Sequence, residues 1–86
     1  MKVFDYKIRD EIGMHARPAG LLGKKAGEFQ SKVIIVNKNG RESRVDGLMG
    51  LLGLGVMCGD VVTVKVEGPD EEIASKAIYD FMEKNL

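Results

Sequence analysis

The sequence predicts an α+β domain of two layers, in which helices cover one face of a β-sheet and the other face meets water. Three observations support this prediction: four short segments resemble strands, three segments space their apolar residues as helices do, and glycine-rich turns separate them. The chain has 86 residues, so we expect a single domain over residues 1–86. A core this small leaves no deep enclosed cleft, which favours a protein that acts by docking at its surface.

A strand and a helix are predicted in the first third of the chain. Residues 3–8 alternate imperfectly between apolar and polar side chains, which indicates a half-buried strand. After a turn at Gly13, residues 16–27 fit an amphipathic helix, with apolar side chains three and four residues apart at Ala16, Ala19, Leu22 and Ala26. Pro18 suits the first turn of this helix, where its missing N–H costs nothing, and Gly27 suits its end.

A predicted hairpin follows. Residues 32–37 read KVIIVN and are rich in β-branched side chains, which favours a strand. Asn39 and Gly40 supply a turn, because both tolerate positive φ. Residues 41–45 then form a short polar strand, which we place at an edge of the sheet or facing outward.

The second half predicts a short helix, a strand and a long helix. Residues 47–54 are too few and too glycine-rich for a helix that is stable alone. Residues 60–67 form a strand whose inner face carries Val62, Val64 and Val66. After a turn that leads to an N-cap at Asp70, residues 71–84 form a helix with one apolar stripe: Ile73, Ala74, Ala77, Ile78, Phe81 and Met82. The order is therefore β-α-β-β-α-β-α.

Charge and cysteine content exclude several classes of protein. Thirteen basic residues balance thirteen acidic ones, so there is no excess positive charge for binding nucleic acid. Cys58 is the single cysteine and cannot form an internal disulfide, which fits a reducing cytoplasmic setting. The charged N-terminal segment is unlike a signal peptide. The sequence also lacks the run of about 20 apolar residues that a membrane-spanning helix needs. We therefore expect a cytoplasmic protein with no membrane contact.

The candidate reactive residue is His15, the only histidine, which directly precedes the first predicted helix. The free N–H groups and the positive dipole end of a helix form an anion site. That end disfavours the imidazolium form, so we expect a neutral, nucleophilic ring. The backbone N–H groups of Ala16 and Arg17 could then hold phosphoryl oxygens, and the Arg17 guanidinium could add a fork of donors. Judged by spacing alone, a plain polar surface histidine is the more common interpretation of such a residue.

Other chemistry is less well supported. A metal site lacks ligands, because His15 and Cys58 are the only imidazole and thiol and lie far apart in the chain. A nucleophilic pair of these two residues is a weaker alternative than an inert, partly buried thiol. We therefore predict no metal and no cofactor.

A second candidate feature is the apolar run in residues 47–56. Leu51 and Leu54 are expected to face the sheet, while Leu48, Met49 and Leu52 are expected to be exposed as a docking surface for protein partners. The alternative is that the whole run is core. Lys24 and Lys25 on the first helix either steer a partner by charge or form a solvated face.

Two stretches resemble a known family. Gly13-Met14-His15-Ala16-Arg17-Pro18-Ala19 closely resembles the active-site signature of the HPr family, the histidine-containing phosphocarriers of the phosphoenolpyruvate-dependent sugar phosphotransferase system. Residues 47–56 look like the second signature of that family, and the resemblance extends over essentially the whole chain. It implies an open-faced β-sandwich, with a four-stranded antiparallel sheet and three helices on one face.

The resemblance also implies a role. His15 would accept a phosphoryl group on Nδ1 from phosphorylated enzyme I and pass it to a sugar-specific enzyme IIA, with Arg17 supporting the phosphate. Such a protein is a carrier and not an enzyme. We expect a monomer, although strand exchange between two copies stays open.

The sequence departs from the family at Gly47, which stands where many members from low-GC Gram-positive bacteria carry a regulatory serine. Glycine has no hydroxyl, so that modification cannot occur there, and Ser43 does not match the site. We hypothesise that the neighbouring Asp46 partly mimics the modified state. Gly53 also replaces the family's usual polar residue near the end of the second helix, which bears on partner choice.

Three other functions remain as alternatives. One is a regulatory HPr paralogue that signals its phosphorylation state. Another is an interaction module that is never phosphorylated. A small hydrolase or metal protein is the least favoured, since no second catalytic partner accompanies His15.

Overall fold

The computed structural model describes residues 1–86 and contains the seven predicted elements in the predicted order. Each boundary lies within one or two residues of its expected position. The elements are β1 (Lys2–Lys7), α1 (Ala16–Ala26), β2 (Lys32–Val36), β3 (Glu42–Arg44), α2 (Leu48–Leu52), β4 (Val61–Glu67) and α3 (Glu71–Asn85). No helix combines the length and the hydropathy needed to cross a membrane.

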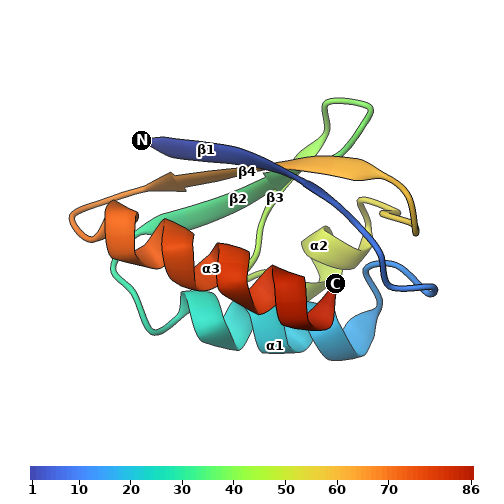
Figure 1. Cartoon of the computed structure of the whole chain (residues 1–86), viewed down its shortest axis with the longest axis horizontal. Helices are drawn as coiled ribbons and strands as arrows, with labels where there is room; N and C mark the ends of the chain where they lie inside the picture. The colour runs from blue at the N-terminus through green and yellow to red at the C-terminus, as the bar shows by residue number, and fades with distance from the viewer.

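The four strands form one antiparallel sheet in the order β1-β4-β2-β3. All three helices lie on the same side of this sheet (Figure 1). The open-faced α+β architecture is therefore confirmed, as is the edge position of the short polar strand β3. The central strand β4 pairs with β1 on one side and with β2 on the other, so it links the N-terminal strand to the middle of the chain.

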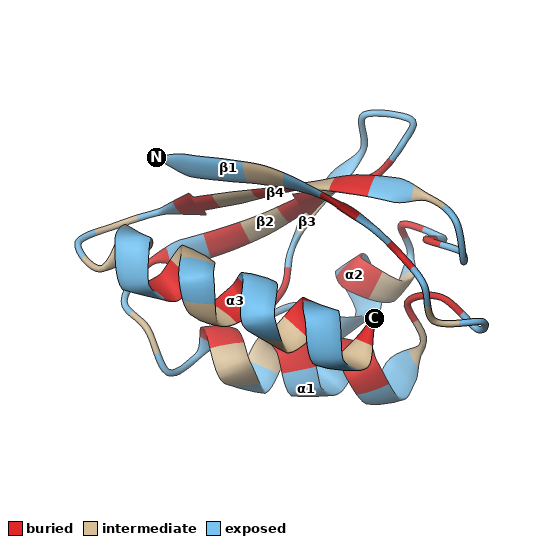
Figure 2. Ribbon diagram, viewed as in Figure 1, coloured by how far each residue is buried: buried red, intermediate tan, exposed pale blue.

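The core lies between the sheet and the helices (Figure 2). Alternation along β4 places Val62, Val64 and Val66 on the inner face, and all three are fully buried. Leu22 of α1 and Ile78 of α3 meet them from the helix layer with no exposed surface. The opposite face of β4 carries the partly exposed Thr63 and Lys65, as expected for an antiparallel sheet with one wet side.

The predicted stripe of α3 is wrong at Ile73, which is 69% exposed. The buried positions are Ala74, Ile78 and Met82, spaced four residues apart along one line of the helix. Ile73 precedes Ala74 by one residue, a rotation of about 100° around the helix axis, and so points to solvent. Ala77 and Phe81 are partly buried at the margin of the stripe.

Asp70 is the N-cap of α3, as predicted, but its side chain makes no capping hydrogen bond. Its carboxylate instead accepts hydrogen bonds from the Gln30 backbone N–H, 2.9 Å away, and from the Ser31 hydroxyl. These two bonds hold the pKa of Asp70 below its usual value, the Ser31 bond being the larger cause. The carboxylate therefore ties the start of α3 to the segment between α1 and β2.

Candidate functional site

His15 is the N-cap residue of α1, as predicted. Its backbone is extended, with φ −104° and ψ 178°, and its carbonyl accepts the first helical bond, from the Ala19 N–H at 3.0 Å. The imidazole makes no capping bond to the helix and is about one-third exposed. The ring therefore stands at the positive end of an 11-residue helix and remains accessible from solvent.

Two backbone donors next to His15 are free. The N–H groups of Ala16 and Arg17 have no acceptor within the protein, and Pro18 has no N–H to offer. The Arg17 side chain is exposed and takes part in no hydrogen bond or ion pair. This helix end can therefore supply two N–H donors and a guanidinium to an anion placed beside the imidazole.

The loop before His15 is held against the segment that precedes β4. The N–H of Met14 donates to the Val56 carbonyl at 3.0 Å, and the Met14 side chain is buried. Gly13 has φ +83°, and a Cβ atom there would lie 2.5 Å from the same carbonyl oxygen. Only glycine suits that position, and its close approach to Val56 brings His15 to the start of α1.

Asp10 is a site residue that the sequence analysis missed. One of its carboxylate oxygens, Oδ1, lies 3.8 Å from Nε2 of His15. The same oxygen accepts the Ile12 N–H at 2.9 Å, which makes a compact Asx turn. An aspartate three residues before Gly13 is a local sign of such a turn, but the sequence does not show that its carboxylate faces the imidazole.

The imidazole lines an open depression of about 220 Å³. Its walls come from the loop after β1, the start of α1 and the end of α3, and its lining residues are Asp10, His15, Arg17, Pro18, Leu21, Lys84 and Asn85. Lys84 was not predicted here. It reaches the depression because the C-terminal end of α3 lies near the start of α1, and the sequence does not show which residues so far apart in the chain come together. With Arg17, Lys84 gives the depression two cationic side chains beside one carboxylate.

The apolar run divides between core and surface as predicted at Leu51, Leu54, Leu48 and Met49, but not at Leu52. Leu51 and Leu54 are buried, while Leu48 is 41% and Met49 80% exposed. The expectation that Leu52 is exposed is wrong, because its side chain packs against the core and is partly buried. Because α2 packs on α1, these exposed side chains belong to the same helix layer as His15 (Figure 1). Leu48 and Met49, together with the part of Leu52 that stays accessible, form an apolar surface that we call the α2 patch.

The two lysines of α1 differ in their surroundings. Lys24 is exposed with no ionic partner, so its charge is available at the surface. Lys25 lies 3.3 Å from the Glu28 carboxylate, which neutralises part of its charge.

Cys58 is exposed, so the expectation of a partly buried thiol is wrong. It lies in the turn before β4, where its Sγ is 3.7 Å from the Arg9 carbonyl oxygen. The structure contains no cluster of three or more histidine, cysteine or acidic side chains with metal-site geometry.

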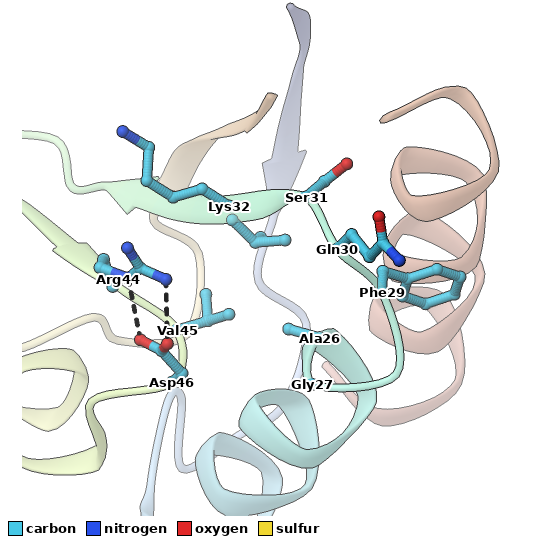
Figure 3. A pocket seen from close by; sticks show the side chains of 10 residues that line it. Ala26, Gly27, Phe29, Gln30, Ser31, Lys32, Arg44, Val45 and Asp46 are labelled. Atoms are coloured by element: carbon cyan, nitrogen blue, oxygen red, sulfur yellow. Dashed lines mark hydrogen bonds and ion pairs between the residues drawn. The ribbon is translucent and has the colours of Figure 1, made fainter. Parts of the chain in front are cut away.

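Gly47 is the N-cap of α2 and its neighbour Asp46 is engaged in an ion pair. Both carboxylate oxygens of Asp46 accept hydrogen bonds from the Arg44 guanidinium at 3.1 Å. This pair borders a cavity of about 300 Å³ between the end of α1 and the start of β2 (Figure 3). Neither His15 nor the α2 patch lines that cavity, so it is separate from the depression at His15.

Comparisons of the sequence and of the fold with known proteins all match members of one family. A family model described as "PTS HPr component phosphorylation site" matches residues 3–84. The phosphocarrier protein HPr of Mycoplasma genitalium is 40% identical over 85 residues, which is 99% of this chain and 97% of that protein. HPr of Mycoplasma pneumoniae is 36% identical over the same shares of both chains. The crystal structure of HPr-C-His from Thermoanaerobacter tengcongensis superposes with a TM-score of 0.91 at 38% identity, covering 99% of this chain and 94% of that one.

Proposed function

Because the chain belongs to the HPr family, the phosphocarrier proteins of the phosphotransferase system, we propose that His15 is the residue that carries the phosphoryl group. The observation that carries this assignment is the place of His15 at the N-cap of α1, beside the two free N–H groups of Ala16 and Arg17. His15 is the only imidazole of the protein, and it lies at a helix end that can hold an anion.

The transfer has two steps. Nδ1 of His15 attacks the phosphorus of the donor's phosphoryl group, and the bond from phosphorus to the donor breaks as the P–N bond forms. The N–H groups of Ala16 and Arg17 then hold the phosphoryl oxygens, and the Arg17 guanidinium neutralises part of their charge. In the second step an acceptor attacks the same phosphorus, and the electron pair of the P–N bond returns to Nδ1. The protein is unchanged after each cycle, as a carrier must be.

The proposed donor is phosphorylated enzyme I and the proposed acceptor is an enzyme IIA. The α2 patch supports docking of such partners, because Leu48 and Met49 expose apolar surface in the same layer as His15. Lys24 adds a free positive charge on α1 that steers an acidic partner. One surface then serves both partners in turn, for which the flexible Met49 side chain is well suited.

Labelling tests the assignment. The protein is incubated with enzyme I and radiolabelled phosphoenolpyruvate, and the label is examined for acid lability and alkali stability, the signature of a phosphohistidine. We expect one phosphoryl group per chain and none on His15→Ala. Label on the His15→Ala variant, or an acid-stable label on the unaltered protein, would show that another residue is modified.

A further inference from the structure

Three hydrogen bonds hold Asp10 in the loop after β1. Its backbone N–H donates to the Leu86 carbonyl at 2.9 Å, and its own carbonyl accepts the Gly13 N–H at 2.9 Å. Its carboxylate accepts the Ile12 N–H at 2.9 Å and is 28% exposed. Three bonds thus fix the backbone and the side chain together, and the carboxylate keeps one position relative to the end of α3.

That position is opposite Nε2 of His15, at 3.8 Å. The other charged side chains that line the depression, Arg17 and Lys84, are cationic. Asp10 therefore supplies the one negative charge in the lining, and it supplies it on the Nε2 side of the ring. Since the two ring nitrogens point in different directions, Nδ1 is the nitrogen left without a protein partner.

We propose that Asp10 is a positioning residue that keeps the ring proton of His15 on Nε2, so that Nδ1 presents its lone pair to the incoming phosphoryl group. A neutral imidazole carries one proton, and a carboxylate beside one nitrogen favours the tautomer with the proton there. The inference rests on the proposed role of His15 as phosphoryl acceptor.

The same contact serves both directions of transfer. When the P–N bond forms at Nδ1, the ring gains positive charge while its proton stays on Nε2, and the Asp10 carboxylate stabilises that charge. When the phosphoryl group leaves, the electron pair returns to Nδ1 and the proton again stays in place. No proton has to move between nitrogens in either step.

The Asx turn offers a simpler role, in which Asp10 only shapes the loop, and one substitution separates the two. Asp10→Asn keeps the Oδ1 atom that accepts the Ile12 N–H but removes the negative charge. Glu11→Gln removes a charge from the adjacent residue, which is exposed and has no hydrogen-bond or ion-pair partner in the structure, and serves as the control.

The readout is the ¹⁵N chemical shifts of the two imidazole nitrogens at a pH where the ring is neutral. The chain has a single histidine, so both signals belong to His15, and their couplings to the ring C–H protons distinguish Nε2 from Nδ1. In the unaltered protein we expect the Nε2–H tautomer to dominate. In Asp10→Asn the tautomer ratio should fall by about two- to fivefold, the size of effect expected for a partly exposed charge contact. Glu11→Gln should match the unaltered protein.

Phosphoryl acceptance from phosphorylated enzyme I completes the test. The rate for Asp10→Asn should also fall, by no more than about fivefold, because the fraction of the Nε2–H form is smaller and the ring charge loses its counter-charge, and the melting temperature should be unchanged. An unchanged tautomer ratio in Asp10→Asn, or an equal change in Glu11→Gln, would overturn the proposal. Failure of the proposed function gives a different result, because then even the unaltered protein takes no label, whereas the NMR measurement needs no phosphate donor.

Discussion

Gly13 and Gly40 have almost the same positive φ, 83° and 82°, but different surroundings. A Cβ atom at Gly40 would meet nothing within 4 Å, whereas one at Gly13 would lie 2.5 Å from the Val56 carbonyl oxygen. Gly40→Ala should cost about 1–2 kcal/mol from backbone conformation alone. Gly13→Ala should cost about 1–3 kcal/mol more, because the loop must also move away from Val56. Urea denaturation of both variants measures the difference, and equal losses would show that the close approach is unimportant.

Arg17 should affect transfer without affecting folding. Its side chain is exposed and makes no hydrogen bond or ion pair within the protein, whereas a charge-assisted bond to phosphate is strong. Arg17→Ala should therefore slow phosphoryl acceptance by about 10- to 100-fold, with a melting temperature within about 2 °C of the original. Lys76→Ala, at an exposed position of α3, is the control and should change neither quantity. If Arg17→Ala unfolds the protein, the proposed role of Arg17 is wrong.

At the scale of one element, α2 has an inner and an outer side with separable effects. Leu51 is fully buried, so Leu51→Ala should lower the free energy of unfolding by about 2–5 kcal/mol. Met49 is 80% exposed, so Met49→Ala should leave stability within about 0.5 kcal/mol. The same change should raise the KM of phosphorylated enzyme I for this protein as its acceptor, because it removes apolar surface from the α2 patch. Denaturation together with transfer kinetics distinguishes the two sides, and an unchanged KM would remove Met49 from the docking surface.

The start of α3 should make stability depend on pH. The Ser31 and Gln30 bonds keep the pKa of Asp70 below its usual 3.8 in the folded state. A carboxyl whose pKa is lowered by folding stabilises the protein above its usual pKa, and this contribution is lost as the pH falls through the folded-state pKa. Asp70→Ala should therefore melt below the unaltered protein at pH 7, and the gap should narrow below pH 3.8.

Asp80→Ala, a change at an exposed carboxylate on the outer side of α3, provides the comparison for that experiment. Its melting temperature should follow the unaltered protein across the same pH range. A gap for Asp70→Ala that stays constant down to pH 2 would mean that packing, and not the charge of Asp70, ties the helix to the loop.

Helices and strands were predictable from the sequence where the spacing of apolar residues alone shows which face of the segment is buried. Alternation at Val62, Val64 and Val66 predicted β4 and its inner face correctly. The limit was reached where burial depends on a neighbour far along the chain. Ile73 fitted the stripe of α3 by spacing, but its side of the helix has no partner, and so it is exposed.

The site was predictable in its local part only. His15 at the N-cap and Arg17 two residues later follow from neighbouring residues and from the turn at Gly13. The carboxylate of Asp10 and the ammonium of Lys84 were missed, because tertiary contacts bring them to the imidazole. The exposure of Cys58 was also missed, because the sequence does not show whether other parts of the chain cover the turn that contains it.

At the scale of the whole molecule, the strand order predicts how the backbone opens. The central strand β4 has a partner on each side and three fully buried valines. Its amides should exchange with D₂O most slowly, close to the rate of global unfolding. The edge strand β3 has three residues and one neighbour, so its amides should exchange far faster. Residue-resolved exchange by NMR checks this, and equal protection of β3 and β4 would contradict it.

The attachment of the His15 loop to later parts of the chain has a consequence for protein synthesis. A ribosome makes residues 9–15 before Val56, whose carbonyl accepts the Met14 N–H, and before Leu86 at the end of α3, which accepts the N–H groups of Arg9 and Asp10. Until those acceptors have emerged, the loop is unanchored, and α1 is shorter than the about 12–15 residues that an isolated helix needs. A nascent chain of this length therefore contains His15 but has neither the anchored loop nor a stable α1 around it. Phosphate donors in the cell meet a competent acceptor only when translation has passed α3.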